Sequence, residues 1–312
     1  MIDIDITTKH VSVIIPNYNG KSLLAQYLPH VLATLQTGDE LIIVDDFSTD
    51  SSVKYLVNHY KLQLVKKKLL PTQVSSDYFP QEKNIEFKLY TNTLTVKKQK
   101  ITIQLVSLQL NVRFAAAANA GVLFAHHDYI LLLNSDVKPT KTVRDQLLKH
   151  FSDATVFGVG CLEYERDHSG EKSGKNKLWF SRGLFMHSKA KDMFTGPTAW
   201  VSGGSGMFDK HKWVALGGFD QLFFPAYWED VDLSFRARKK GWKVLFDQDA
   251  VVYHIHESTN TDVYGAQKIL NMSWKNALAF VKKNANFWQL LQHYLFLPYW
   301  NYVRNKLVNQ EL

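Results

Sequence analysis

The sequence predicts an α/β fold built on a mostly parallel sheet whose two faces are covered by helices. Continuous apolar runs of strand length alternate with helical patterns along the first half of the chain. Strands that are apolar throughout are typical of a parallel sheet buried on both sides. Three of these runs end in polar or acidic residues, and the carboxyl ends of parallel strands meet at one edge, where ligands bind.

The first predicted strand, residues 11–16, leads into a turn at residues 17–20. Apolar residues then recur at helical spacing until Gly38 ends the helix. Residues 41–44 form the second strand, which ends in Asp45 and Asp46. Another helix begins near residue 48.

Residues 61–105 interrupt this rhythm because they are polar, basic and without clear periodicity. We interpret them as an insertion that contains a hairpin of residues 87–91 against Thr95 and residues 101–108. A helix at residues 114–125 and a third strand at residues 129–133 follow, and that strand ends in Asn134–Ser135–Asp136.

The second half is less regular. Glycine-rich turns at residues 200–206 and 216–220 would let the backbone approach a ligand. Short strands are expected at residues 244–246 and 250–254, and two helices at about 262–284 and about 287–307. We therefore expect residues 1–260 to form one domain and residues 261–312 to form a helical extension.

The composition is that of an ordinary globular protein, with 46% hydrophobic and 21% charged residues. The single cysteine, Cys161, excludes an intrachain disulfide and, with the polar N-terminus, favours the cytoplasm. A net charge of +8 permits phosphate-rich partners. Nucleic acid is not expected among them, because no nucleic-acid-binding motif accompanies the charge.

The C-terminal region has the composition of a membrane-surface helix. No stretch of about 18 apolar residues exists, so we expect no transmembrane helix. Residues 287–303 are rich in Trp, Tyr, Phe and Leu, and basic residues flank them. Such a helix lies on an anionic membrane, here the inner face of the plasma membrane. A helix packed on the domain explains the composition equally well.

Six motifs in order resemble those of a family 2 glycosyltransferase: VSVIIPNYNG, LIIVDDFSTD, NVRFAAAANAG, YILLLNSDV, GGFDQLFFPAYWEDVDLSFRARKKGW and VVYHIHES. The pattern is most similar to the rhamnosyltransferase and galactofuranosyltransferase-like branch. The resemblance implies a GT-A fold and transfer of a sugar from a nucleotide-diphosphate sugar, UDP- or dTDP-linked. The implied acceptor is a saccharide or a lipid-linked molecule of cell-surface polysaccharide biosynthesis.

The resemblance also implies a nucleotide site. Base and ribose would be contacted by the first strand end and by Asp46, with Asp45 supporting the loop. Arg113 and Asn119 would approach the base and the diphosphate. Taken alone, an acidic pair after a strand could simply cap a helix, and Arg113 could be a surface residue. The implied nucleotide-binding residues are Pro16, Tyr18, Asn19, Asp45, Asp46, Arg113, Asn119 and Asn134.

Asn134–Ser135–Asp136 stands where the family has its DxD metal motif, so the first acid is replaced by Asn134. Asp136 and His254 are the implied ligands of Mg²⁺ or Mn²⁺, a Lewis acid for the leaving diphosphate. His256 would share a strand face with His254. A lone histidine at a strand end is more often structural.

Glu229 and Asp230 are the implied catalytic pair. Inverting transfer needs a base for the acceptor hydroxyl proton; the family assigns this role to the position of Asp230, and Glu229 would bind acceptor hydroxyls. Asp230 could instead cap the helix that it opens. The implied acceptor or sugar site adds Gly203, Gly204, Trp228 and Trp200, although both tryptophans could equally be core residues.

Three other functions fit the sequence less well. A Rossmann oxidoreductase needs a GxGxxG turn after the first strand, where this chain has PNYNG. A nucleotidyltransferase needs a glycine-rich, lysine-bearing triphosphate loop, which is not seen. A catalytically impaired relative that binds sugars or acts as a scaffold is supported only by Asn134, since Asp136, Asp230 and His254 remain.

Overall fold

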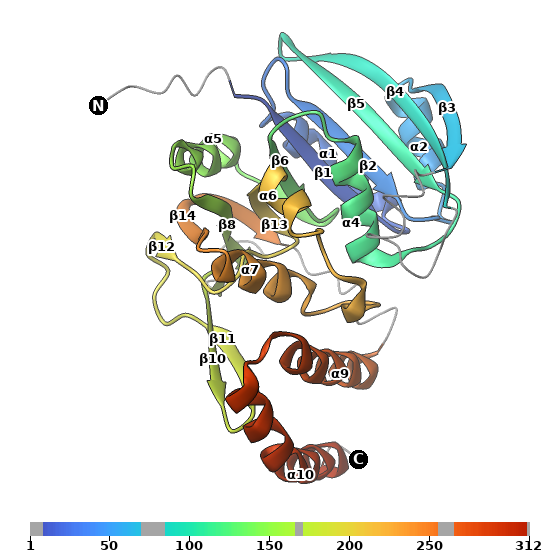
Figure 1. Ribbon diagram of the computed structural model, residues 1–312. Coiled ribbons are helices and arrows are strands. Elements are labelled where there is room, and N and C mark those ends of the chain that lie inside the picture. Colours follow the sequence, from blue (N-terminus) through green and yellow to red (C-terminus); the bar gives the residue numbers. More distant parts are fainter. Residues whose placement is uncertain (1–8, 70–84, 166–170, 255–264, 311–312) are drawn as a thin grey trace.

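A computed structural model describes residues 9–69, 85–165, 171–254 and 265–310 (Figure 1). Its centre is one twisted sheet in the order β12-β14-β8-β13-β6-β1-β2-β5-β4-β3, with β7 paired to β14 and β9 to β8. The strands are β1 (Val11–Asn17), β2 (Glu40–Asp45), β3 (Gln63–Leu69), β4 (Glu86–Val96), β5 (Gln99–Leu108), β6 (Tyr129–Leu133), β7 (Val137–Pro139), β8 (Val156–Glu165), β9 (Lys172–Ser173), β12 (Gly196–Pro197), β13 (Ser205–Asp209) and β14 (Lys243–His254).

The middle of the sheet is parallel, as the buried apolar strands predict. β1 pairs in parallel with β2 and β6, and β2 pairs in parallel with β5. β13 runs antiparallel between β6 and β8, whereas β8 and β14 are parallel to each other. The carboxyl ends of β1, β2, β6, β8 and β14 and the start of β13 therefore lie at the same edge. The two short strands expected at residues 244–246 and 250–254 are one strand, β14, with a register irregularity between Asp247 and Val251.

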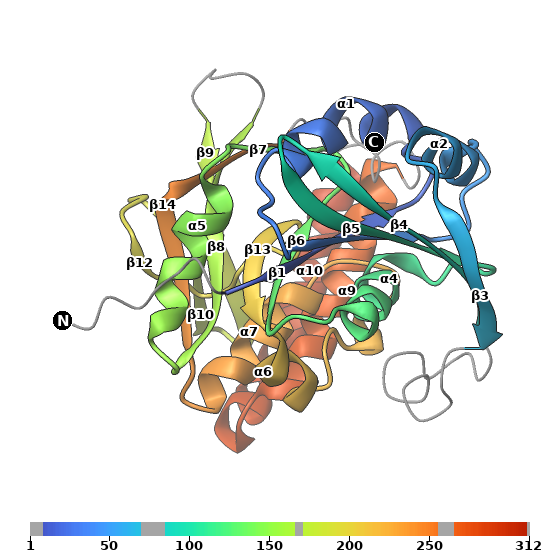
Figure 2. The same cartoon turned by 90° about the horizontal axis from the view of Figure 1, so that it is seen from above.

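Helices cover both faces of the sheet (Figure 2). α1 (Lys21–Leu32), α2 (Ser52–His59) and α5 (Val143–Leu148) pack on one face. α4 (Arg113–Phe124), α6 (Lys210–Ala215) and α7 (Glu229–Lys239) pack on the other. The 3-10 turn η2 (Lys149–Ser152) adds to the first layer, whereas the turn η3 (Gln221–Phe223) packs with the C-terminal cluster described below. The alanines of α4 are buried, which lets this helix lie close against the strands.

The segment at residues 61–105 differs from the expected insertion. Residues 87–91 do pair antiparallel with part of β5, as expected of a hairpin, whereas Thr95 lies on β4 itself and not opposite them. However, β5 also pairs with β2 along its length, so it belongs to the central sheet, and β4 and β3 continue the sheet outward. The polar pattern led to the wrong expectation of an insertion because β3 and β4 lie toward the edge of the sheet, where many side chains stay partly exposed.

The C-terminal part forms a third hydrophobic cluster outside the main sheet. It combines the hairpin β10 (Asn176–Ser181) and β11 (Leu184–Lys189) with α9 (Ala266–Asn284) and α10 (Phe287–Gln310). These helices lie together at the bottom of Figure 1. Among the residues described, none of the helices has the length and apolarity needed to cross a membrane.

Candidate active site

The loops after β1 and β2 are tied to each other by side chains. Asn17 donates from Nδ2 to Asp45 Oδ1 at 2.9 Å, and the Ser48 amide donates to Asp45 Oδ2 at 3.1 Å. Asn19 Oδ1 accepts from the Thr49 amide at 2.7 Å. Asp45 and Asn19 thus shape the loops at the expected nucleotide site. Nearby, Pro16 is buried and Tyr18 is partly exposed.

Asp46 turns toward the main chain that precedes α4. Its two oxygens accept from the amides of Val112 at 2.6 Å and Arg113 at 2.9 Å. Burial raises the pKa of Asp46 to about 6, although these two hydrogen bonds oppose the shift. The contact fixes the loop in which Arg113 takes the left-handed conformation, with φ of 70°. The carboxylate therefore positions Arg113 at the edge of the expected site.

Asn119 lies elsewhere than expected for a diphosphate-binding residue. Its side chain is completely buried, donates to the Phe219 carbonyl at 2.8 Å and accepts from the Phe219 amide at 3.0 Å. It joins α4 to the loop before η3 and presents no surface to a ligand in this structure. The side-chain amide of Asn119 is needed there because the buried main-chain groups of Phe219 require hydrogen-bond partners.

The chain brings Asp136 and His254 together, as expected of a pair that serves one metal. His254 Nε2 lies 3.2 Å from Asp136 Oδ1. Burial alone would lower the pKa of His254, but Asp136 and Glu163 raise it to about 10. His256 lies outside the described residues.

Glu163, near the end of β8, is a site residue that sequence reasoning missed. It is buried, its Oε2 lies 3.9 Å from His254 Nδ1, and its Oε1 accepts a hydrogen bond from Ser205. Burial alone would raise the pKa of Glu163, but His254 and Ser205 lower it. A glutamate behind a metal-binding histidine orients the ring. Its only signal in the sequence was an acid within an apolar strand.

Asp136 and His254 fit a divalent cation shared with a diphosphate. Asp136 Oδ1 is buried and faces the imidazole of His254. Carboxylate oxygen and imidazole nitrogen suit Mn²⁺, and Mg²⁺ usually takes few protein ligands beside substrate phosphates. The described residues include no cluster of three or more His, Cys, Asp or Glu that could hold an ion by themselves. The remaining positions would therefore belong to the diphosphate and water.

The acidic pair opens α7, but Asp230 is not its N-cap. The N-cap is Trp228, whose φ is 78° and whose side chain makes no capping hydrogen bond. Asp230 is the second residue of the helix and accepts from the amides of Val231 at 2.8 Å and Gly203 at 3.2 Å. Glu229 is 7% exposed, and no described group bonds its Oε2. Burial raises the pKa of both carboxyls, and the charge of Asp230 raises that of Glu229 further.

Two glycines connect this acidic pair to the Asn134–Asp136 loop. The Gly203 amide bonds Asp230, and the Gly204 carbonyl accepts from the Asn134 amide at 2.9 Å. A methyl group at Gly204 would lie only 2.5 Å from Asn134 Nδ2. The absence of side chains thus lets the expected base and the expected diphosphate loop approach one turn from both sides.

Trp228 is a core residue in this structure, which corrects the expected sugar-stacking role. It is 6% exposed and packs against the rings of His187 and Phe280 at centroid distances of 5.2 and 5.1 Å. Trp200 is partly buried and meets His187 edge-on at 5.7 Å. Both tryptophans therefore contact the ring of His187.

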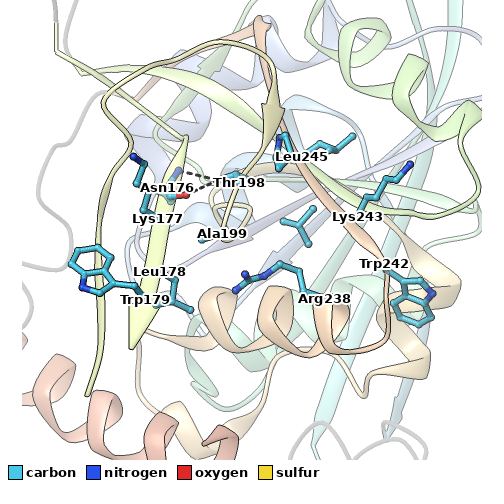
Figure 3. A pocket seen from close by; sticks show the side chains of 12 residues that line it. Asn176, Lys177, Leu178, Trp179, Thr198, Ala199, Arg238, Trp242, Lys243 and Leu245 are labelled. Atoms are coloured by element: carbon cyan, nitrogen blue, oxygen red, sulfur yellow. Dashed lines mark hydrogen bonds between the residues drawn. The ribbon is translucent and has the colours of Figure 1, made fainter. Parts of the chain in front are cut away.

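A cavity of about 740 Å³ lies away from these acidic loops (Figure 3). β10, β12, the end of α7 and the start of β14 line it, and Thr198 Oγ1 accepts from the Asn176 amide across it. Val244 is ten residues before His254 on β14, or roughly 30 Å along an extended strand. No carboxylate is among its lining residues, so acid–base chemistry is not placed there.

The central sheet with acidic loops at its carboxyl edge defines the class: this is the GT-A fold of glycosyltransferases. The chain is similar to a crystal structure of GalNAc-T7 with UDP, GalNAc and Mn²⁺, with a TM-score of 0.55 and 15% identity over 80% of this chain and 44% of that one. It is also similar to the mannosyltransferase PcManGT from Pyrobaculum calidifontis in complex with GDP-Man and Mn²⁺. There the TM-score is 0.54, with 17% identity over 94% of this chain and 76% of that one. At these identities the likeness concerns the fold.

Sequence comparison gives the particular relatives. Residues 12–73 match the family model described as glycosyl transferase family 2. The pre-mycofactocin glycosyltransferase of Mycobacterium tuberculosis is 29% identical over 160 residues, which is 47% of this chain and 31% of that protein. The N-acetylglucosaminyl-diphospho-decaprenol L-rhamnosyltransferase of the same organism is 37% identical over 67 residues, or 21% of this chain and 22% of that protein. The chain thus spans less than a third of the length of these relatives.

Proposed function

We propose that this protein is an inverting glycosyltransferase that uses a nucleotide-diphosphate sugar. The observation that supports it best is the turn at Gly203–Gly204, which holds Asp230 on one side and the Asn134–Asp136 loop on the other. A base and a diphosphate-binding loop on opposite sides of one turn suit a single displacement at a sugar carbon. The family 2 match of residues 12–73 supports the same class of reaction.

In the proposed reaction, ionised Asp230 accepts the proton of an acceptor hydroxyl. The hydroxyl oxygen forms a bond to the anomeric carbon while the bond from that carbon to the diphosphate oxygen breaks. The products are the inverted glycoside and a nucleoside diphosphate. Asp136 and His254 would hold Mn²⁺ or Mg²⁺, which neutralises charge on the leaving diphosphate when bound. Glu163 keeps the His254 ring oriented.

The donor and acceptor follow from the resemblance and the relatives. We propose a UDP- or dTDP-sugar as donor and a saccharide or lipid-linked molecule of cell-surface polysaccharide biosynthesis as acceptor. The name of the matching rhamnosyltransferase, which includes a diphospho-decaprenol, supports a lipid-linked acceptor. The lipid-linked option also agrees with the surface of α10.

We further propose that α10 rests on a membrane surface. Its exposed side includes seven large apolar or aromatic residues, while the opposite side is bound to the β10–β11 turn, where His293 Nδ1 donates to the Gly183 carbonyl at 2.9 Å. Aromatic and aliphatic side chains on one face are typical of helices at the lipid–water boundary. The exposed large hydrophobic residues are Phe287, Trp288, Leu291, Tyr294, Leu295, Tyr299 and Tyr302, here called the α10 apolar face.

The transferase proposal is tested by release of nucleoside diphosphate from a panel of UDP-, dTDP- and GDP-sugars with Mn²⁺ and candidate acceptors. Asp230→Asn and Asp136→Ala should each lower turnover at least about 10²-fold, the scale of losing an acid–base group. Asp128→Asn is the matched control, since Asp128 is exposed and lies before β6, at the opposite edge. Wild-type turnover in Asp230→Asn would refute the base, and no release from any donor would favour the non-catalytic relative.

A further inference from the structure

α9 presents two faces with different partners. On the inner face, Asn276 donates to the carbonyls of Phe223, Ala226 and Tyr227, each within 2.9 Å. Lys283, on the same side, is bound to Asp220 at 2.6 Å and Asp232 at 2.8 Å. These contacts fasten α9 to the loop and helix that carry the acidic pair. The outward face of α9 is not needed for this attachment.

A groove of about 460 Å³ lies between this outward face and α10. Arg304 spans it, donating from Nη2 to Asn271 Oδ1 at 2.6 Å with its guanidinium 5.8 Å from the centre of the Trp274 ring. Lys275 and Lys282 are exposed at its rim, two helical turns apart, and neither is bound to an acid in the described part of the chain. The groove is lined by Asn271, Trp274, Lys275, Leu278, Ala279, Lys282, Asn301 and Arg304.

The charge of this region is of one sign. Between Asp262 and Glu311 the sequence contains no Asp or Glu, but it contains Lys268, Lys275, Lys282, Lys283, Arg304 and Lys306. Three of these cations line the groove. Cations that line a hollow without a carboxylate to neutralise them favour an anion with several oxygens, such as a phosphate group.

The groove also adjoins the α10 apolar face. Asn301 directly precedes Tyr302, so its side chain lies about 100° round the helix from a residue of that face. A helix at a bilayer surface buries its apolar side roughly 5–10 Å deep, at the boundary between acyl chains and headgroups. The groove would then lie at the depth of the lipid phosphates.

We propose that the α9–α10 groove binds the headgroup phosphates of an anionic phospholipid bilayer. The proposal rests on the membrane association of α10. Apolar contact would supply binding to any bilayer, and the groove would supply preference for anionic lipid. Bound in this way, α9 connects the lipid surface directly to the loop before Asp230, because Asn276 and Lys283 bond to that loop.

The test is flotation of the full-length protein with vesicles of phosphatidylcholine alone and of equal parts phosphatidylcholine and phosphatidylglycerol. The double variant Lys275→Gln/Lys282→Gln should lose at least roughly 10-fold in partition to the anionic vesicles, since each lysine near such a surface contributes about 1 kcal/mol. Its residual binding to neutral vesicles should stay at the wild-type level. Lys54→Gln/Lys141→Gln removes the same charge from exposed lysines of other elements and should change anionic binding by less than about 3-fold.

Equal losses of anionic binding in the two double variants would show that only net charge matters, and would refute binding of headgroup phosphates in the groove. Wild-type anionic binding in Lys275→Gln/Lys282→Gln would overturn it as well. Trp288→Ser/Leu295→Ser should weaken binding to both vesicles. If the wild-type protein binds neither vesicle, membrane association itself fails, and nucleoside diphosphate release in solution tests the transferase proposal separately.

Discussion

At the scale of single residues, two adjacent carboxyls have different environments. Asp230 accepts two main-chain hydrogen bonds, whereas Glu229 is buried and its Oε2 has no partner among the described groups. Environments that separate the pKa values of neighbouring acids assign them different roles. We therefore expect Asp230 to ionise first, which suits the proposed role of base, and Glu229 to stay protonated to higher pH.

Glu229→Gln tests this difference through stability. Because the folded pKa of Glu229 is raised above its unfolded value of about 4.3, its contribution to stability is full below that pH and is lost as pH rises through the folded pKa. The wild type and the variant should unfold at similar temperatures near pH 4. At about pH 9 the variant should be more stable by at least ~2 °C. Scanning calorimetry across this pH range measures the difference in unfolding temperature between the two proteins.

Glu171→Gln serves as the control because Glu171 is exposed and carries the same charge. Its unfolding temperature should follow that of the wild type at every pH. A constant difference between Glu229→Gln and the wild type across the range would mean that the pKa of Glu229 is the same in the folded and the unfolded protein.

At the scale of elements, the turn at Gly203–Gly204 before β13 shapes the expected site more than α7 does. It receives the Asp230 carboxylate at Gly203 and packs Asn134 against Gly204. Neither contact involves a neighbour in sequence: Gly203 and Asp230 are 27 residues apart. The geometry of the expected site therefore depends on the sheet that brings β6, β13 and α7 together.

Gly204→Ala should displace the Asn134 side chain, since the added methyl group would lie 2.5 Å from its Nδ2. We expect nucleoside diphosphate affinity with Mn²⁺, measured by calorimetry, to fall roughly tenfold, because small displacements in a site cost this much or more. Gly160→Ala is the matched control: its methyl group would meet neighbours no closer than 3.7 Å. Equal affinity in the two variants would show that the turn does not shape the site.

At the scale of the whole molecule, a nucleotide and a metal should stabilise the fold together. The loops after β1, β2 and β6 follow neighbouring strands of the sheet but lie far apart in the sequence, so a ligand that binds all of them favours the folded state. At 100 times its dissociation constant a ligand adds about 2.7 kcal/mol. We expect UDP or dTDP with Mn²⁺ to raise the unfolding temperature by at least ~4 °C.

The nucleotide alone or Mn²⁺ alone should raise the unfolding temperature less than the two together. A chelator should remove most of the combined shift. Asp136→Ala should abolish the dependence on Mn²⁺ while keeping the small effect of the nucleotide. An equal shift in the presence of chelator would contradict the assignment of Asp136 and His254 to a metal.

Much of this protein follows from local sequence. Apolar runs and helical spacing predicted the alternating strands and helices, because these patterns depend on residues a few positions apart. The pattern at residues 61–105 failed for the same reason: edge strands keep exposed polar side chains, so local polarity does not reveal that β5 joins the central sheet. The ordered motifs also placed Asp136 and His254 at one edge, and the structure brings them within 3.2 Å.

Only the tertiary structure decided which polar residues remain available for chemistry. Asn119 bonds the main chain 100 residues away, Trp228 enters the aromatic core, and Glu163 stands behind His254. The sequence by itself determined the class of fold and that Asp45, Asp46 and Asp136 stand near its carboxyl edge. Whether a side chain faces a ligand or a distant backbone group depends on which buried polar atoms need partners, and that requirement arises only when the chain is folded.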